Sequence, residues 1–238
     1  MNDLEGKAAG GWDFLLTSQP PRTLFFDYDG CLHDSLKIYA PAFRAAQDFL
    51  FAHGLAVPRD WPDSEIQTWI GLPPTDMWQR FRPDLTPAIA RQASQVITDQ
   101  MLRAVQNGQA ALYPHTEKVL QTLAAQGLNL ILVSHCKIAY LDAHTRQFHL
   151  DRYFKKLIAS ESYGYQDKST ILGQLSLLYP GPYAMIGDRA SDMVAGRANQ
   201  MLTIGCTYGY AAPGELDQAD LRIRSLTDLI EIFAATPT

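Results

Sequence analysis

Residues 23–30, with the sequence TLFFDYDG, carry the strongest indication of the fold. Its first four residues are apolar or β-branched and lead directly into Asp27, a pattern typical of a buried parallel strand whose carboxyl end meets solvent. Asp29 follows two positions later, and the turn at Gly30 can bring both carboxylates to one mouth of the strand. We therefore expect a functional centre at the end of this strand.

Four further short apolar runs have the same character, at residues 130–133, 157–159, 184–186 and 202–204. Helical patterns alternate with them over residues 116–126, 138–148, 170–178 and 191–199. This alternation predicts an α/β fold, a doubly wound (Rossmann-like) parallel sheet. Ligands bind such sheets outside the carboxyl ends of the strands, where Asp27, Ser134 and Asp188 are expected to lie.

About a hundred residues separate the first strand from the second, whereas a βαβ crossover needs only about a dozen or more. The interval has helical patterns at residues 38–53, 63–70, 75–81 and 87–106 and no strand pattern. We predict a core of residues 23–32 and 108–238, an inserted α-helical cap domain of residues 33–107, and an N-terminal extension of residues 1–22 without assigned function. Trp61, Trp69 and Trp78 are expected in the cap core. Arg44, Arg80 and Arg82 are expected on its surface or paired between domains, with contact to a substrate carboxylate as the alternative.

Composition favours a small-molecule partner. The 25 acidic and 20 basic residues give a formal net charge of -5, which supplies no broad field for nucleic acid or a membrane surface. No apolar run approaches the roughly 18 residues of a membrane span, and the acidic N-terminus is unlike a signal peptide. Cys31, Cys136 and Cys206 lack metal-site spacing and are interpreted as reduced thiols of a cytoplasmic protein, monomeric or homodimeric.

The acidic residues divide into chemical roles. Asp27 is placed to attack phosphorus, while Asp29 protonates the leaving oxygen and later activates water. Asp188 also follows a strand, and Mg²⁺ commonly takes one or two carboxylates together with phosphate and water. Asp192 lies one helical turn beyond Asp188, where it can orient that residue or Lys168.

A phosphate group also needs donors and positive charge. Ser134 opens a helix, so its hydroxyl and the amide of His135 can hold phosphoryl oxygens, and Lys168 neutralises charge in the transition state. Together with Gly30 these are the candidate phosphate-binding residues. His135 is equally compatible with a role as a packed loop residue. Taken alone, Ser134, Asp188 or Asp192 could cap a helix, and Lys168 could be a surface residue.

In order along the chain, these residues resemble a known family. Asp27-x-Asp29-Gly30-x-Leu32, Ser134, Lys168 and Gly187-Asp188 with Asp192 are similar to the four motifs of the haloacid dehalogenase-like hydrolases, in the subfamily with a helical cap. Phosphoglycolate phosphatase-like members are similar in residues 207–216. The resemblance implies a phosphorylated Asp27, Asp29 as acid and base, and Mg²⁺ bound by Asp27, Asp188 and the Asp29 carbonyl.

The same resemblance implies that a cap loop containing Gly71 and Leu72 helps to choose the substrate. Two positions depart from the family pattern, because His135 stands where many members have asparagine and Ser169 where they have proline. The sequence thus predicts a Mg²⁺-dependent phosphatase acting on a small phosphorylated metabolite such as phosphoglycolate, a nucleoside monophosphate or a sugar phosphate. A phosphomutase, a receiver-like signalling protein and a non-catalytic phosphate binder are the alternatives.

Overall fold

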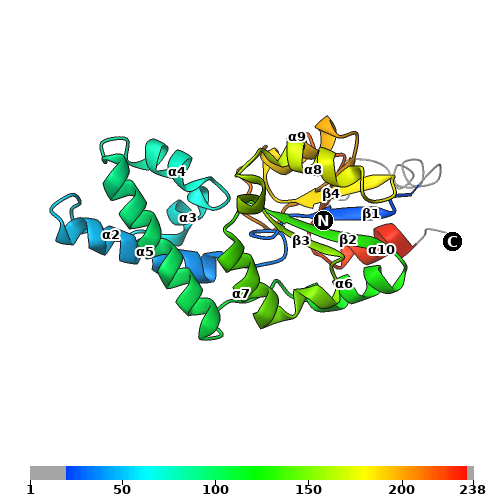
Figure 1. Ribbon diagram of the computed structural model, residues 1–238, viewed down its shortest axis with the longest axis horizontal. Helices are drawn as coiled ribbons and strands as arrows, with labels where there is room; N and C mark the ends of the chain where they lie inside the picture. Colours follow the sequence, from blue (N-terminus) through cyan, green and yellow to red (C-terminus); the bar gives the residue numbers. More distant parts are fainter. Residues whose placement is uncertain (1–19, 235–238) are drawn as a thin grey trace, which may run out of the picture.

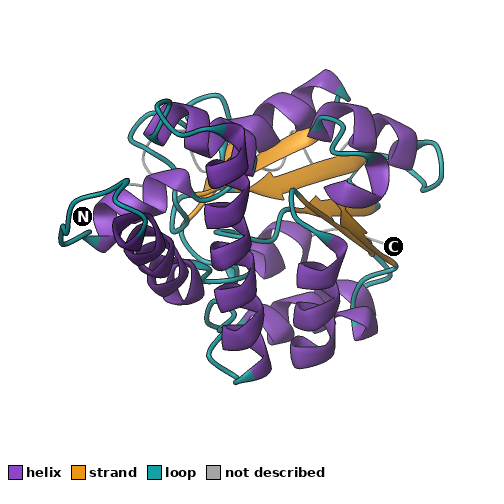
Figure 2. Cartoon of the chain, turned by 60° about the vertical axis from the view of Figure 1, so that its left-hand side comes forward, coloured by secondary structure: helices purple, strands orange, loops and turns teal. Residues whose placement is uncertain are grey.

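A parallel sheet with helices on both faces forms one part of the molecule, and a group of helices forms the other (Figures 1 and 2). The computed structural model describes residues 20–234. The strands run β3-β2-β1-β4-β5-β6 across the sheet, all parallel. Their bounds are β1 Thr23–Phe26, β2 Asn129–Ser134, β3 Lys156–Ala159, β4 Tyr183–Gly187, β5 Leu202–Cys206 and β6 Leu221–Ile223.

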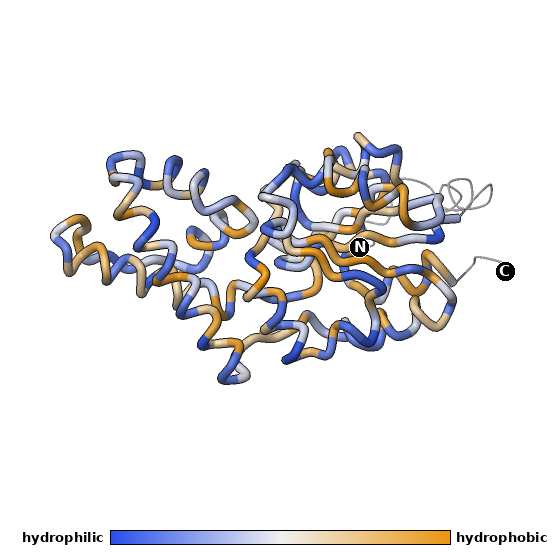
Figure 3. The backbone as a smooth tube through the Cα atoms, in the orientation of Figure 1, coloured by the Kyte–Doolittle hydropathy of each residue, from blue (hydrophilic) through white to orange (hydrophobic). Residues whose placement is uncertain are grey.

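Strand β1 lies in the middle of the sheet, which explains its continuous apolar sequence. Phe25 is in register with Ile131 on one side and with Met185 on the other. All four residues of the strand are buried, since helices cover both faces. Figure 3 shows the hydrophobic strands as the interior of this part of the molecule. The predicted doubly wound sheet is confirmed.

Alternate residues of β1 point into two different cores. Phe26 belongs to the larger core, which the helices α6 (Thr116–Ala125), α7 (Ile138–Phe148) and α10 (Asp228–Ala234) cover. Phe25 belongs to the smaller core under α8 (Lys168–Ser176) and α9 (Ala190–Ala198). Figure 1 shows α8 and α9 on one side of the sheet and α6, α7 and α10 on the other.

The helical group follows β1 in the chain and comprises α2 (Leu36–Ala52), α3 (Asp63–Ile66), α4 (Pro74–Phe81) and α5 (Pro87–Gln106). Its core holds the apolar faces of α2, α4 and α5, with Trp78 buried and donating to Ser94 Oγ at 2.7 Å. Trp61 and Trp69 pack against a neighbouring cluster around Phe43. The helix α5 begins where Thr86 caps the Ile89 amide and Pro87 needs no donor.

The structure differs from the sequence-based elements in a few places. The helix expected at residues 63–70 is α3 followed by a short 3-10 turn, Gln67–Trp69. The helix α8 begins at Lys168, two residues early, because the Asp167 carboxylate caps the Thr170 amide at 2.9 Å. The strand β6 and the helix α10 were not predicted. The N-terminal extension lies almost wholly outside the described residues.

Within residues 20–234 the structure has neither a membrane-spanning helix nor a disulfide. No helix in this range combines the length and apolarity needed to cross a bilayer. Cys31, Cys136 and Cys206 are all free thiols, with the sulfurs of Cys31 and Cys206 3.7 Å apart in the core.

Candidate active site

The carboxyl ends of the three central strands gather the candidate residues. Asp27 follows β1 and its amide donates to the Ile186 carbonyl of β4 at 2.8 Å. Asp188 comes directly after β4, and Ser134 is the last residue of β2. Because β1 pairs with both neighbours, the three residues share one edge of the sheet. The structure therefore places Asp27, Ser134 and Asp188 at the carboxyl ends of the strands, as expected from the sequence.

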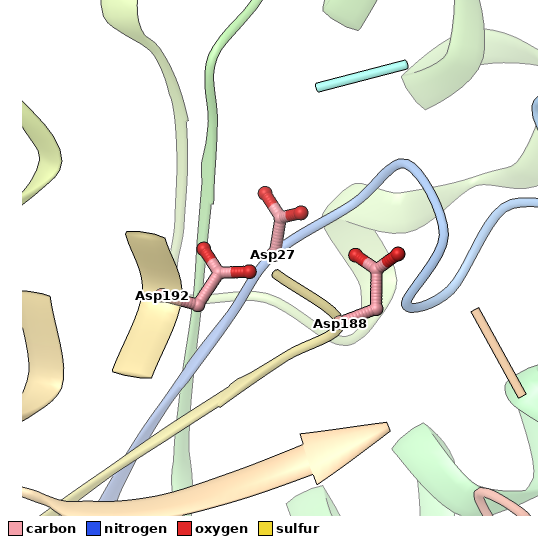
Figure 4. A group of neighbouring side chains, drawn as sticks. All are labelled: Asp27, Asp188 and Asp192. Carbon is pink, nitrogen blue, oxygen red and sulfur yellow. The ribbon is translucent and has the colours of Figure 1, made fainter. Parts of the chain in front are cut away.

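Three carboxylates lie together at this edge. One oxygen each of Asp27, Asp188 and Asp192 lies within 4.8 Å of the others, and all three residues are buried. Figure 4 shows the three side chains converging from the ends of β1 and β4 and from the first turn of α9. Like charges held this close in a low dielectric repel one another strongly, so the cluster needs cations.

Lys168 supplies one positive charge. Its Nζ donates to Oδ1 of Asp27 at 2.8 Å and to Oδ1 of Asp192 at 2.5 Å. The second oxygen of Asp192 accepts the Arg189 amide at 3.0 Å, which ties this carboxylate to the start of α9. Burial opposes the charge on Lys168, but Asp192 and Asp27 together raise its pKa, so the ammonium stays protonated. Lys168 thus bridges the predicted nucleophile and the predicted orienting residue.

One ammonium does not neutralise three carboxylates. Burial raises the pKa of Asp27 to about 7, helped by the charge of Asp192 and opposed by Lys168. Burial, followed by the charges of Asp27 and Asp192, raises the pKa of Asp188 well above its usual range. Both shifts come first from burial and then from neighbouring carboxylates, whose negative charge exceeds the one positive charge of Lys168. A divalent cation at this place would remove that excess.

Asp188 provides a direct test of whether such a cation fits. Its Oδ2 accepts the Tyr210 amide at 2.7 Å, whereas its Oδ1 is buried and meets no hydrogen-bond partner among the described residues. A buried carboxylate oxygen without a donor is costly unless a ligand fills the gap. Hard oxygen donors of this kind suit Mg²⁺. The residues present therefore fit the ion.

Two glycines let the backbone approach Asp188. A side chain at Gly30, whose φ is +83°, would overlap the Asp188 carboxylate, and one at Gly209 would overlap both Asp188 and the Gly30 carbonyl. Gly30 therefore allows the backbone to pass close to the Asp188 carboxylate. Its role in phosphate binding stays a prediction. Gly209 lies in the stretch 207–216, and no local sequence pattern indicates its contact with Asp188.

Asp29 lies directly before the turn at Gly30, with its side chain 20% exposed. Its Oδ1 accepts hydrogen bonds from His33 Nδ1 at 2.9 Å and from the Tyr140 hydroxyl at 2.8 Å. Burial alone would raise the pKa of Asp29, but the hydrogen bond and charge of His33, with His144 and Tyr140, lower it overall. No local sequence pattern marks His33, Tyr140 or His144 as functional residues.

A cavity of about 150 Å³ opens next to Asp29, between the core and the helical group. The core side contributes His135, Cys136, Lys137 and Tyr140, and the helical group contributes mainly apolar side chains. Gly71 and Leu72 are both in the wall, so the predicted cap loop does face this cavity. The apolar residues of the wall are Tyr39, Trp69, Ile70, Leu72, Pro74, Met77, Ile97 and Met101.

His135 lies in the cavity wall rather than in the packed interior. Burial and the nearby charge of Lys168 lower its pKa, so the ring is neutral at pH 7. Ser134 is buried at the end of β2. Ser134 therefore lies at the same sheet edge as the three carboxylates, and His135 lies in the cavity wall beside it.

One contact that sequence analysis missed connects the helical group to the sheet edge. Arg189 donates through Nη1 to the Ile70 carbonyl at 3.0 Å and through Nε to Glu215 at 2.9 Å. Glu215 also accepts the Ala190 amide at 3.0 Å. Because Ile70 precedes Gly71, this arginine holds the cap loop beside the motif that carries Asp188. No sequence pattern signals the pairing, since its partners lie far apart in the chain.

Comparison with known proteins adds an independent finding. Residues 21–199 match the model of the haloacid dehalogenase-like hydrolases, which is most of the chain. A phosphoglycolate phosphatase from Psychrobacter arcticus is 27% identical over 199 residues, covering 79% of this chain and 84% of its own. The phosphoglycolate phosphatase of Escherichia coli K12 is 26% identical over 239 residues, covering 88% and 91%.

Solved structures share the fold. A protein described as a predicted phosphoglycolate phosphatase, from Haemophilus somnus, superposes with a TM-score of 0.74 at 22% identity over 89% of this chain and 97% of its own. The CbbY protein of Rhodobacter sphaeroides, crystallised with phosphate, gives a TM-score of 0.71 at 18% identity over 88% and 96%. At these identities the likeness concerns the arrangement of the sheet and helices.

Proposed function

Because this chain belongs to the haloacid dehalogenase-like hydrolases and is a phosphatase of that family, we propose that it hydrolyses a small phosphate monoester through a phosphoaspartyl intermediate on Asp27. The observation that carries the proposal is the contact between Lys168 and Asp27 within the carboxylate cluster at the strand ends. The ammonium holds one oxygen of Asp27 and leaves the other to attack. The relatives named phosphoglycolate phosphatase support the reaction class.

The first step transfers the phosphoryl group to the enzyme. A carboxylate oxygen of Asp27 attacks phosphorus, the bond from phosphorus to the substrate oxygen breaks, and Asp29 gives its proton to that oxygen. Lys168, Ser134 and the amide at His135 hold the phosphoryl oxygens while negative charge spreads over them. The product is an alcohol, and Asp27 carries the phosphate as an acyl phosphate.

The second step releases phosphate. Water attacks phosphorus and gives a proton to Asp29, which lost its own proton in the first step, and the bond between phosphorus and Asp27 breaks. Asp27, Asp188 and the main-chain carbonyl of Asp29 would hold Mg²⁺, and Asp192 would keep Lys168 in place. The ion would supply the positive charge that offsets the carboxylates and the phosphoryl oxygens.

The cap in this proposal comprises residues 33–107, and its loop at Gly71 and Leu72 selects the leaving group. The partner is a small phosphorylated metabolite rather than nucleic acid or a membrane. A cytoplasmic location and a monomeric or homodimeric state stay predictions from the sequence.

Phosphate release from a panel of monophosphates tests the proposal. The panel includes phosphoglycolate, ethyl phosphate, p-nitrophenyl phosphate, nucleoside monophosphates and sugar phosphates, each assayed with Mg²⁺ and with EDTA. We expect turnover of at least one ester with Mg²⁺ and a loss of at least about a hundredfold with EDTA, because the carboxylates then repel the phosphate. Silence across the panel would contradict the proposal and favour a phosphomutase or a phosphate binder.

The cavity wall makes a further prediction about the leaving group. Among the described residues that line the cavity, Lys137 is the one lysine or arginine. Within the helical group, Arg44 pairs with Asp63 and Arg82 pairs with Asp84. The Leu72→Arg variant adds a cation to this wall. We expect its kcat/KM for phosphoglycolate, relative to ethyl phosphate, to rise by about fivefold, which corresponds to about 1 kcal/mol for an ion pair with partial solvent access.

Leu72→Met is the matched control, since it keeps the size and apolar character of the side chain and should leave the ratio at its wild-type value. An unchanged ratio in Leu72→Arg, in a protein that still turns over ethyl phosphate, would show that the carboxylate of phosphoglycolate does not reach this wall.

A further inference from the structure

The carboxyl group of Asp29 is anchored by one oxygen only. His33 and Tyr140 both donate to Oδ1, at 2.9 Å and 2.8 Å. No hydrogen bond within the described residues engages Oδ2, although the side chain lines the cavity beside the strand ends. The two donors come from distant parts of the chain, because His33 follows the turn after β1 and Tyr140 belongs to α7. Two separate elements thus converge on a single oxygen.

The two donors are themselves held rigidly. The His33 ring stacks on Tyr28, with centroids 5.2 Å apart and planes 12° apart. His144 packs against His33 and Tyr140 at 4.5 Å and 4.3 Å, and its Nδ1 is 2.8 Å from the Tyr28 hydroxyl. His33 and His144 are fully buried. Rings packed on several sides keep one rotamer, so the hydrogen bonds to Asp29 are fixed in direction.

The hydrogen-bond pattern also specifies the proton positions. A carboxylate oxygen accepts, so His33 donates from Nδ1, and its Nε2 is buried without a partner among the described residues. The Tyr140 hydroxyl donates to the same oxygen. Both lone-pair directions of Oδ1 are then occupied, and a proton shared with substrate must reside on Oδ2.

We propose that His33 and Tyr140 are positioning residues, which fix Oδ1 of Asp29 so that Oδ2 meets the leaving oxygen of the substrate. The inference rests on the proposed function, in which Asp29 protonates that oxygen. General acid catalysis needs the two heavy atoms at hydrogen-bond distance, and a displacement of about 1 Å can lower a rate about a hundredfold. Without these two hydrogen bonds the carboxyl group of Asp29 would rotate about its side-chain bonds.

The alternative is that the rings of His33 and Tyr140 only fill the core. Esters with different leaving groups distinguish this packing role from a positioning role. An alkoxide is strongly basic and must be protonated as it departs, whereas p-nitrophenolate departs without help. The value of kcat/KM reports phosphoryl transfer to Asp27 and is unaffected by later release of phosphate from it. Loss of positioning should therefore lower kcat/KM for alkyl esters selectively, while loss of packing should lower it equally for all esters.

The experiment measures kcat/KM of wild type, Tyr140→Phe and His33→Leu on ethyl phosphate and on p-nitrophenyl phosphate. We expect a decrease of about 10- to 100-fold for ethyl phosphate and of about twofold or less for p-nitrophenyl phosphate in each variant. His33→Asn restores a short-chain donor at the same place, and we expect it to recover about tenfold of what His33→Leu loses on ethyl phosphate.

Tyr183→Phe is the matched control, because the Tyr183 hydroxyl donates to the Ser176 and Tyr179 carbonyls at 2.5 Å and 2.9 Å, away from the site. Its ratio of the two kcat/KM values should equal that of wild type. Equal decreases for both esters in the test variants, or none, would overturn the positioning role while leaving the phosphatase proposal standing. A wild type that hydrolyses no ester of the monophosphate panel, these two included, would overturn both.

Discussion

The Asp27→Asn variant is expected to lose phosphatase activity by at least about a thousandfold with every substrate that the wild type accepts. An amide oxygen is a poor nucleophile toward phosphorus, and the phosphoaspartyl intermediate cannot form at any other side chain of the site. The change is nearly isosteric, so the fold should persist. Steady-state phosphate release and mass spectrometry of acid-quenched enzyme, which detects the added phosphoryl group, together provide the measurement.

Asp48→Asn is a suitable control, since Asp48 is exposed on α2 and carries the same change of charge. It should retain wild-type turnover. A folded Asp27→Asn variant with wild-type turnover would refute the assignment of the nucleophile. A phosphoryl group that stays on wild-type Asp27 without turnover would instead favour a receiver-like signalling role.

The Lys168→Met variant is expected to lose both activity and stability. The side chain is 10% exposed and bridges two carboxylates, so its removal leaves Asp27 and Asp192 buried without their cation. Breaking a buried ion pair by deleting one partner costs about 3–5 kcal/mol. For a chain of this size, about 3 kcal/mol lowers Tm by roughly 6–12 °C. Activity should fall by about a hundredfold or more, because the transition state loses a charge.

Thermal unfolding and phosphate release, both in excess Mg²⁺, measure the two effects. Lys118→Met serves as the control, since Lys118 is exposed on α6 and its loss should change neither quantity appreciably. Unaltered Tm together with unaltered turnover in Lys168→Met would contradict the bridging role. Unaltered turnover with a lowered Tm would confine Lys168 to a structural role.

Much of the site was predictable because a few consecutive residues are enough to indicate where a buried strand ends. Phe25 and Phe26 form part of a short apolar run that can only be buried, and a carboxylate directly after such a run must meet the sheet edge. The same reasoning applies to Ser134 after β2 and Asp188 after β4. Five of the six strands followed from short apolar runs, and the four cap helical segments followed from helical periodicity.

Other features gave no local signal. The strand β6 has three residues, and its middle residue, Arg222, is exposed, so neither a run nor an alternation of useful length exists. His33 and Tyr140 meet across 107 positions of the chain. Gly209 is needed only because the loop after β5 passes over Asp188.

Burial and periodicity act over a few neighbouring residues. Local patterns were therefore enough to predict the alternation of strands and helices, the insertion after β1 and the polar residues at the strand ends. Tertiary structure alone decided that Lys168 bridges Asp27 and Asp192, that Arg189 holds the cap loop, and that two distant donors anchor one oxygen of Asp29. Those contacts depend on the path of the whole chain, which brings together residues that no local pattern relates.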